Sequence, residues 1–268
     1  MSQRSTGSTV AKVLITILVL VVLLIILAEV GLRMFMSNQI TSSIEEQSQQ
    51  DQVELTEEPE VSFGTAPLVF GLFAGQLNEV NVRTPSTLEI TEQAVSGQPA
   101  TDLHMQGMDL SEEMVSDRVT VTTELPEDYL LAVMREQLVR QQPEDAGPLA
   151  DHLTVTDVTA NGADNTIDLE FVHGAAVISL TPVEQDGQVS FAADGTQIFG
   201  FDLPEQATDQ ITEAFAEGVN AQTNEEANVR IADIQILDGA LRITLDGENV
   251  PLGELARQAE QSGELGRV

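Results

Sequence analysis

An uninterrupted apolar run near the N-terminus constrains this chain more than any other feature. Residues 13–30 read VLITILVLVVLLIILAEV, and Thr16 is the only polar residue before Glu29. As an α-helix, this run would be roughly 27 Å long, which is close to the hydrocarbon thickness of a bilayer. The sequence therefore predicts a membrane-spanning helix over residues 13–30.

A cleaved secretory signal peptide is the main alternative, because its apolar core can approach this length. An uncleaved signal anchor is favoured, since no A-x-A cleavage site follows, no cysteine offers a lipid attachment point, and the helical pattern continues past Glu29. Arg4 and Lys12 precede the run, whereas an acidic region follows Arg33. The positive-inside rule then places the N-terminus in the cytoplasm and the rest of the chain outside.

Composition indicates a packed, strongly acidic domain after this helix. The formal net charge is −33, from 44 acidic and 11 basic residues, which argues against binding to a nucleic-acid backbone. Hydrophobic residues make up 42% of the chain, more than a disordered tail would contain. The single tyrosine and the absence of tryptophan argue against aromatic stacking platforms for sugars or bases.

Residues 31–60 predict a helix that continues the anchor and then an acidic connector. Apolar residues four apart form one stripe of this helix: Leu32, Met36, Ile40 and Ile44. The simplest interpretation is a juxtamembrane helix that packs on its own domain, and the alternative is an oligomerisation helix.

The segment 61–84 reads VSFGTAPLVFGLFAGQLNEVNVRT and predicts a short helix between two strands. Pro67 can open the helix and Gly75 can close it. Because LVFGLFA is apolar nearly all round, the helix is expected to be buried in the core. A lip that contacts the membrane or a lipid is the alternative.

The remaining chain alternates strands with two helices, and its order suggests an internal repeat. LPE occurs at 125 and at 203, and the strand cores VTDV and IADI begin 76 residues apart, at 155 and 231. This spacing favours a duplicated α+β unit, with a long antiparallel sheet and helices on one face. Met134 and Phe215 lie at the middle of the two helical stripes and are expected to point inward.

No arrangement of residues indicates catalysis or metal binding. The histidines, His104, His152 and His173, are isolated from one another, and the chain has no cysteine. Asp164 and Asp168 imitate the start of a calcium loop, but Leu169 occupies the position that needs glycine. We therefore predict a protein that is not an enzyme and holds no metal or cofactor.

Four segments, 61–84, 181–191, 199–204 and 229–252, together with the anchor, resemble the LmeA-like phospholipid-binding family of actinobacterial cell envelopes. That family usually carries F-G-x-x-P-F-L-x-x-L-x-x-G, and this chain has Phe63, Gly64, Pro67, Leu72 and Gly75 at the corresponding positions. Leu68 replaces the phenylalanine after the proline, and Val69 and Phe70 supply part of its bulk.

The resemblance implies an α+β fold like half of a tubular lipid-binding (BPI-like) protein, with a curved antiparallel sheet wrapped on long helices. It also implies acyl chains held in a groove, a role in envelope lipid or lipoglycan maintenance, and phosphatidylinositol-type lipids as candidate ligands. The residues expected to contact lipid are Leu68, Phe70, Leu72, Phe73, Met134 and Phe215. The alternative is a scaffolding protein with a dry core that binds other envelope proteins.

The expected organisation follows from these segments. It comprises a cytoplasmic N-terminus (1–12), a transmembrane signal anchor (13–30), a juxtamembrane helix and acidic connector (31–60), a lipid-binding α+β domain (61–252) and a C-terminal tail (253–268).

Overall fold

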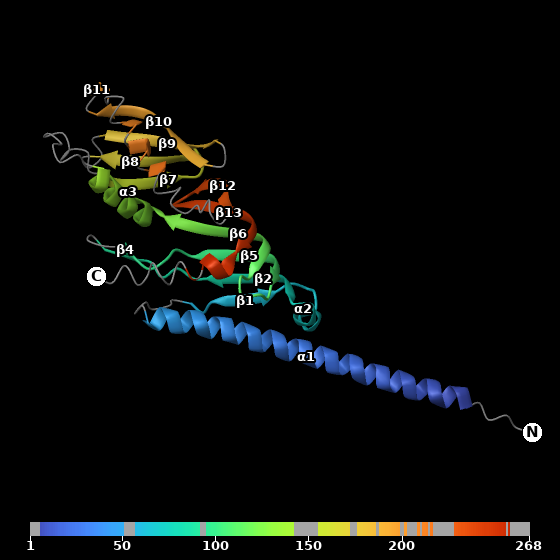
Figure 1. Ribbon diagram of the computed structural model, residues 1–268. Helices are drawn as coiled ribbons and strands as arrows, with labels where there is room; N and C mark the ends of the chain where they lie inside the picture. Colours follow the sequence, from blue (N-terminus) through green and yellow to red (C-terminus); the bar gives the residue numbers. More distant parts are fainter. Residues whose placement is uncertain are drawn as a thin grey trace, which may run out of the picture.

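The fold consists of one long N-terminal helix and two antiparallel sheets, as the computed structural model shows (Figure 1). The structure describes residues 6–50, 57–91, 95–141, 155–171, 176–185, 188–198, 201–202, 208–209, 211–213, 215–216, 228–255 and 257. The N-terminal helix, α1, runs without interruption over Thr6–Gln50. The predicted anchor and the helix that follows it are therefore parts of one continuous helix.

The two halves of α1 have different surroundings. The side chains of residues 18–28 are exposed, although nearly all of them are large and apolar. Further along, Leu32, Met36 and Ile40 are partly buried against the domain, and Ser37 Oγ donates a hydrogen bond to the carbonyl of Val61 at 3.3 Å. The stripe predicted after the anchor thus packs on its own domain, as expected.

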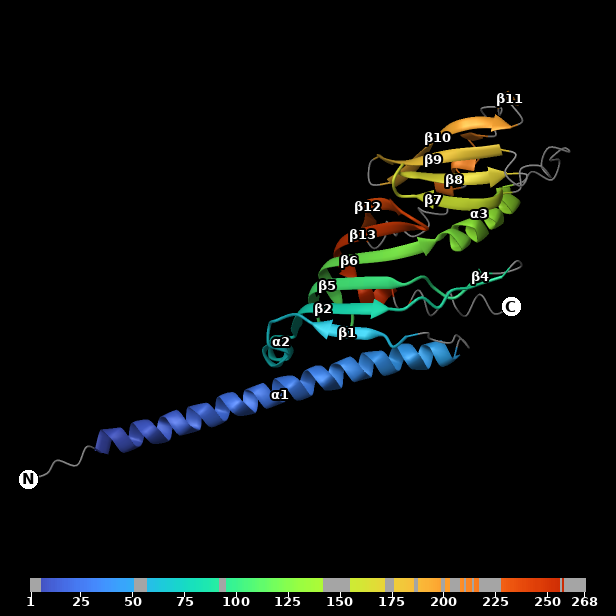
Figure 2. The ribbon, with the colours of Figure 1, turned by 180° about the vertical axis from the view of Figure 1, so that it is seen from behind.

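The larger sheet has six antiparallel strands in the order β1-β2-β5-β6-β13-β12. In chain order the strands are β1 (Glu60–Phe63), β2 (Gln76–Thr84), β5 (Thr101–Asp109), β6 (Val115–Pro126), β12 (Val229–Leu237) and β13 (Ala240–Pro251). Helix α1 lies along the β1 edge of this sheet in both ribbon views (Figures 1 and 2).

The smaller sheet has five antiparallel strands in the order β11-β10-β9-β8-β7 and lies at the end of the molecule away from α1 (Figures 1 and 2). In chain order they are β7 (Val155–Asn161), β8 (Thr166–Phe171), β9 (Ala176–Gln185), β10 (Gln188–Ile198) and β11 (Phe201–Asp202). Helix α3 (Glu127–Gln141) packs on β7. Two further short strands, β3 (Glu89–Ile90) and β4 (Val95–Ser96), pair antiparallel with each other.

The expectation of one long sheet is wrong, because the ladder is broken between β7 and β12. These two edge strands lie close together but are not paired. Each carries a register shift against its hairpin partner, between Val155 and Asp157 in β7 and between Ile231 and Asp233 in β12. Bulges increase the local twist and interrupt hydrogen bonding, so two bulged edges do not continue one ladder.

The internal repeat is visible in the same two hairpins. The register shifts lie 76 residues apart, as do VTDV and IADI. The two hairpin turns also contact each other: Gly162 N–H donates to Asp238 Oδ1 at 3.1 Å, and Gly239 N–H donates to the carbonyl of Ala160 at 3.2 Å. The repeat predicted from spacing therefore corresponds to two matched hairpins that meet at their turns.

Buried apolar residues form two clusters. The distal cluster joins the smaller sheet, α3 and the helical residues 211–213 and 215–216 to β12, β13 and the end of β6. The anchor-side cluster lies under α1 and is smaller; its buried members are Phe63, Leu68, Leu77, Val80, Met105, Val119 and Val250. Val121 and Val229 are partly buried against both clusters and mark the boundary between them.

Candidate functional site

Helix α2 (Leu68–Ala74) presents apolar side chains to its surroundings. Pro67 precedes the helix, and Gly75 ends it in the left-handed conformation with φ of 74°. Leu68 and Gly71 are buried, but the side chains at three other positions are exposed: Phe70 at 59%, Leu72 at 40% and Phe73 at 88%.

The expectation that this helix is buried core is therefore wrong. Only one side of α2 faces the domain, and Gly71 allows that side to approach closely: a Cβ there would lie 2.6 Å from the carbonyl oxygen of Gln76. At the margin of the sheet this seven-residue helix packs against β2 and α1, and these contacts leave its remaining apolar side chains uncovered.

Two charged residues of α1 hold this helix in place. The Glu29 carboxylate accepts hydrogen bonds from the backbone N–H groups of Leu68 at 2.9 Å and Val69 at 3.1 Å. These N–H groups belong to the first turn of α2, where no intrahelical partner exists. Arg33 Nε in turn donates to Glu29 Oε1 at 2.7 Å.

The Arg33 guanidinium completes the connection. Its two terminal nitrogens donate to the carbonyls of Phe63, Gly64 and Ala66, each at 2.9 Å. We call Glu29 and Arg33 together the α1 clamp. Sequence reasoning missed it, although an acid and a base four residues apart at the end of an apolar run were a visible signal.

A row of half-buried apolar side chains crosses the larger sheet on the face that also carries the anchor-side cluster. The register aligns Val61 with Val82, Val82 with Leu103, and Leu103 with Val121. The row continues into Leu245, which is buried. We call the four half-buried residues the apolar row. All four residues pack against the anchor-side cluster, and Val121 packs against the distal cluster as well. Because their side chains are only half-buried, the row leaves apolar surface accessible.

The apolar row could not have been read from the sequence. The alternation in VSF, VNV, LHM and VTV indicates four strands with one apolar face each. Which of these residues lie side by side depends on register, and register is set by pairing between strands that are distant in the sequence.

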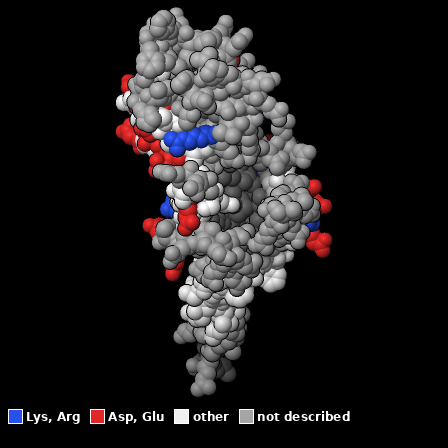
Figure 3. All heavy atoms as spheres, turned by 90° about the vertical axis from the view of Figure 1, so that its left-hand side faces the viewer, with Lys and Arg blue, Asp and Glu red and all other residues white. Residues whose placement is uncertain are grey.

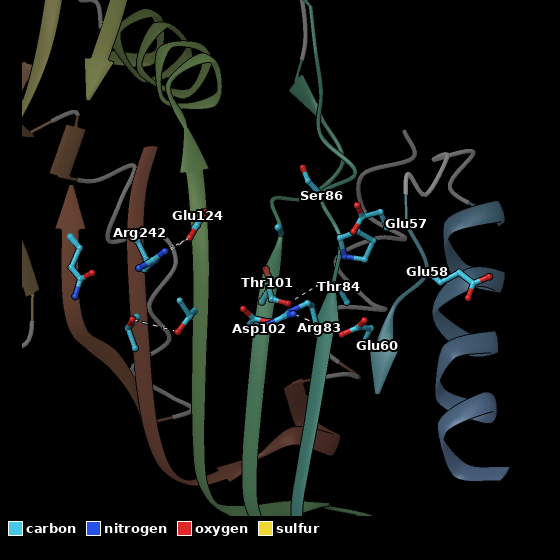
Figure 4. Close-up of a pocket in the computed structure, with 15 residues that line it drawn as sticks. Glu57, Glu58, Glu60, Arg83, Thr84, Ser86, Thr101, Asp102, Glu124 and Arg242 are labelled. Atoms are coloured by element: carbon cyan, nitrogen blue, oxygen red, sulfur yellow. Dashed lines mark hydrogen bonds and ion pairs between the residues drawn. The ribbon is translucent and has the colours of Figure 1, made fainter. Parts of the chain in front are cut away.

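The opposite face of the larger sheet is polar and carries a hollow of about 760 Å³ (Figure 4). Arg83 Nε donates to Asp102 Oδ1 at 2.6 Å, and Arg242 Nε donates to Glu124 Oε1 at 3.0 Å. Asp102 raises the pKa of Arg83 through its hydrogen bond and its charge. Glu57, Glu58 and Glu60 also line the hollow. Because both guanidinium groups are paired and acidic side chains are in excess, this hollow suits neither an acyl chain nor a phosphate.

Charged side chains lie over the domain, whereas none is seen on the described part of α1 that extends away from it (Figure 3). This agrees with the sequence, in which residues 13–28 contain no charged side chain. The acidic character of the protein therefore belongs to the domain and not to the exposed helix.

The six residues predicted to contact lipid lie in three places. Leu68 belongs to the anchor-side cluster, and the exposed side of α2 carries Phe70, Leu72 and Phe73. Met134 and Phe215 are buried in the distal cluster, at 1% and 4% exposure, so both point inward. The ring of Phe215 packs edge-to-face on Phe191 with 4.7 Å between centroids. The structure does not bring the six together, and their contact with lipid stays a prediction.

No metal or catalytic centre emerges from the part of the chain that the structure describes. His104 lies on the polar face, bonded to Asn81 and Gln106, while His152 and His173 fall outside the described residues. No group of three potential metal ligands occurs among the described residues. Around the imitated calcium loop, Asn161 Oδ1 accepts hydrogen bonds from the N–H groups of Ala163 and Asp164, as in an ordinary Asx turn.

Comparison with known proteins gives one match. No curated protein and no solved structure matches the chain. The family model described as LmeA-like phospholipid-binding matches residues 27–246, which is well over half of the chain. The match begins inside α1, just before the clamp, and it includes α2, the apolar row, the distal cluster and the anchor-side cluster except for Val250, Leu252 and Leu255. This chain therefore belongs to the LmeA-like phospholipid-binding family.

Proposed function

We propose that this protein is a membrane-anchored, extracytoplasmic phospholipid-binding protein whose ligand lays its acyl chains along the apolar row of the larger sheet. The supporting observation is the half-buried state of Val61, Val82, Leu103 and Val121, which pack against the anchor-side cluster and reach the distal cluster at Val121. Accessible apolar surface gains from being covered by hydrocarbon, and family membership supports phospholipid as the ligand class.

The free energies favour acyl chains over the headgroup as the source of affinity. Burying one methylene contributes about 0.8 kcal/mol, so ten methylenes contribute about 8 kcal/mol. One headgroup hydrogen bond adds about 1 kcal/mol net. A domain with this acidic charge can therefore bind phospholipid, including phosphatidylinositol-type lipids, without a basic headgroup pocket.

We propose that α1 is an uncleaved anchor. Its residues 18–44 are long and apolar enough to cross a membrane. The α1 clamp and the packing of Leu32, Met36 and Ile40 make the following part of the helix integral to the domain. Orientation follows the positive-inside rule, so residues 31–268 face outward. Protease added to intact spheroplasts should remove the domain; cleavage that requires lysis would refute this orientation.

The arrangement also supports a relation to half of the tubular lipid-binding fold, since α1 packs on the larger antiparallel sheet and α3 packs on β7 and β6, where the two sheets come together. In this proposal the protein maintains envelope lipid or lipoglycan by holding lipid outside the membrane, and it performs no chemical step.

The test uses full-length protein purified in mild detergent. Solvent extraction and mass spectrometry should find stoichiometric phospholipid, and Leu103→Gln should lose most of it while keeping the wild-type circular dichroism. His104→Ala is the matched control, because it changes the next residue of the same strand on the opposite face. Retention of lipid by folded Leu103→Gln, or its absence from the wild type, would refute the proposal.

Scaffolding remains the second candidate, and one observation favours it. The distal cluster is fully packed around Met134 and Phe215, as a protein with a dry core requires. In that case no phospholipid would accompany the purified protein.

A further inference from the structure

The exposed side of α2 lies where the apolar run of α1 ends. Glu29 and Arg33 are the first charged residues after Lys12; Glu29 binds the first turn of α2, and Arg33 binds the segment that leads into it. Glu29 and Arg33 are four positions apart in the helix, which is about 6 Å along its axis. The depth of α2 relative to the end of the run is therefore set by hydrogen bonds rather than by a flexible linker.

The exposed surface of α2 consists of large apolar side chains, whose contact with water is unfavourable. The helix reads LVFGLFA and contains no polar side chain, and three of its large residues are exposed. Single exposed apolar residues are normal on soluble proteins, but Phe70, Leu72 and Phe73 lie together on one short helix. This surface is adjacent to the exposed half of α1, whose side chains are apolar as well.

We propose that α2 is a membrane-docking lip, in which Phe70, Leu72 and Phe73 insert into the outer leaflet of the bilayer that α1 crosses. The α1 clamp positions the lip at this depth. This inference rests on the proposed anchoring of α1, and it adds that the domain is fixed against the membrane surface instead of hanging from it.

Charge and connectivity both favour the bilayer over another protein. The domain is strongly acidic and is repelled by anionic headgroups, so an uncharged apolar projection is the part suited to approach the leaflet. Apolar side chains that project from a polar protein settle at the boundary between headgroups and acyl chains. Because α1 already holds α2 beside the membrane, insertion requires no separate encounter.

Docking also gives the apolar row an entrance. β1 carries Val61, the first residue of the row, and the chain passes from β1 directly into α2. A lip inserted in the leaflet would place the β1 end of the row beside the lipid.

The chain has no cysteine, so single cysteines can report depth in the full-length protein. We suggest Phe73→Cys for the lip, Leu23→Cys for the exposed run of α1 and Val183→Cys as an exposed apolar control on β9. Each is labelled with an environment-sensitive dye and reconstituted into phosphatidylcholine–phosphatidylglycerol liposomes that contain lipids brominated near the carbonyl end. We expect blue-shifted, quenched emission at Phe73 and Leu23, and aqueous emission at Val183.

The outcomes separate the lip from the anchor. Quenching at Leu23 with aqueous emission at Phe73 would refute the lip alone. Aqueous emission at both would refute the anchor, and the lip with it. A further measurement adds one equivalent of brominated lipid to the labelled protein in detergent, where no bilayer is present. If the dye at Phe73 is quenched as strongly there as in liposomes, it contacts a bound lipid molecule, and the bilayer-docking proposal is overturned.

The positioning role of the clamp has its own readout. In the Phe73→Cys protein, Arg33→Ala should shift the dye emission toward the aqueous value, because three carbonyl contacts are lost. In the Leu23→Cys protein the same substitution should leave the emission unchanged, and the circular dichroism of both proteins should stay the same. Arg33→Lys retains the charge but not the planar fork of donors, so its emission should lie between that of Arg33→Ala and that of the protein with Arg33 intact. An unchanged spectrum in folded Arg33→Ala would refute the positioning role.

Discussion

The two ends of the molecule are packed in different ways. In the distal cluster, Ile167, Leu169, Phe171, Leu180, Leu241 and Ile243 have no exposed surface. In the anchor-side cluster the most buried residues keep slightly more exposure, and many partners are only half covered. The difference follows from the cover, since the distal cluster is enclosed by a second sheet and α3, whereas the other end is covered by single helices. We infer that the distal end supplies stability and the anchor end supplies the lipid-facing surface.

Polar contacts follow the same division. At the distal end, Glu127 and Arg135 of α3 bind backbone groups of β7: Glu127 accepts from Ala160 N–H at 2.7 Å, and Arg135 donates to the carbonyl of Val155 at 2.9 Å. At the anchor end, Glu29 and Arg33 of α1 bind the backbone around α2. In both places a helix is fixed by an acid and a base, but only the second fixes an exposed apolar surface.

The largest expected effect tests whether the distal cluster is dry. Phe215→Ala should lower the free energy of unfolding by about 3–5 kcal/mol, because it leaves a cavity beside Phe191. Unfolding is measured in detergent with and without added phospholipid, and we expect little recovery. Recovery in Phe215→Ala, or in the companion Met134→Ala, would show that an acyl chain enters this cluster and that the two ends do not differ as we infer.

An intermediate effect is expected where α3 is fixed to β7. Glu127→Ala should lower the free energy of unfolding by about 1.5–3 kcal/mol, because the buried Ala160 N–H loses a charged acceptor. Asp128→Ala is the control, since Asp128 lies in the same first turn and is exposed. Lipid content should not change in either variant. Equal losses in the two would mean that the helix dipole, and not the hydrogen bond, is responsible.

The smallest effect is expected on the polar face of the larger sheet. Arg83→Gln removes an ion pair whose two side chains are both mostly exposed, and such pairs contribute little to stability. We expect no measurable change in the melting temperature or in bound phospholipid. A loss of lipid in this variant would place a headgroup contact in the hollow of Figure 4 and would extend the lipid site to both faces.

Elements whose signals are local were predicted well from the sequence. The stripe Leu32, Met36 and Ile40 lies against the domain, Gly75 ends α2, and Met134 and Phe215 point into the core. Helical periodicity and a glycine with positive φ are properties of a few adjacent residues, so neighbouring residues suffice to identify them. The 76-residue spacing of the two matched hairpins was also visible, because it can be read directly from VTDV and IADI.

The tertiary structure alone decided which apolar surfaces are covered. The letters LVFGLFA are equally compatible with a buried helix and an exposed one, and only the position of α2 at the margin of the sheet leaves Phe70, Leu72 and Phe73 uncovered. The apolar row depends on the register of strands distant in the sequence, and the α1 clamp joins residues 30 to 40 positions apart. The sequence by itself determined the apolar helix, the acidic α+β domain and the family, because composition, periodicity and motif are written in the chain. Which apolar side chains are buried, and which distant residues touch, depends on where the folded chain places each segment.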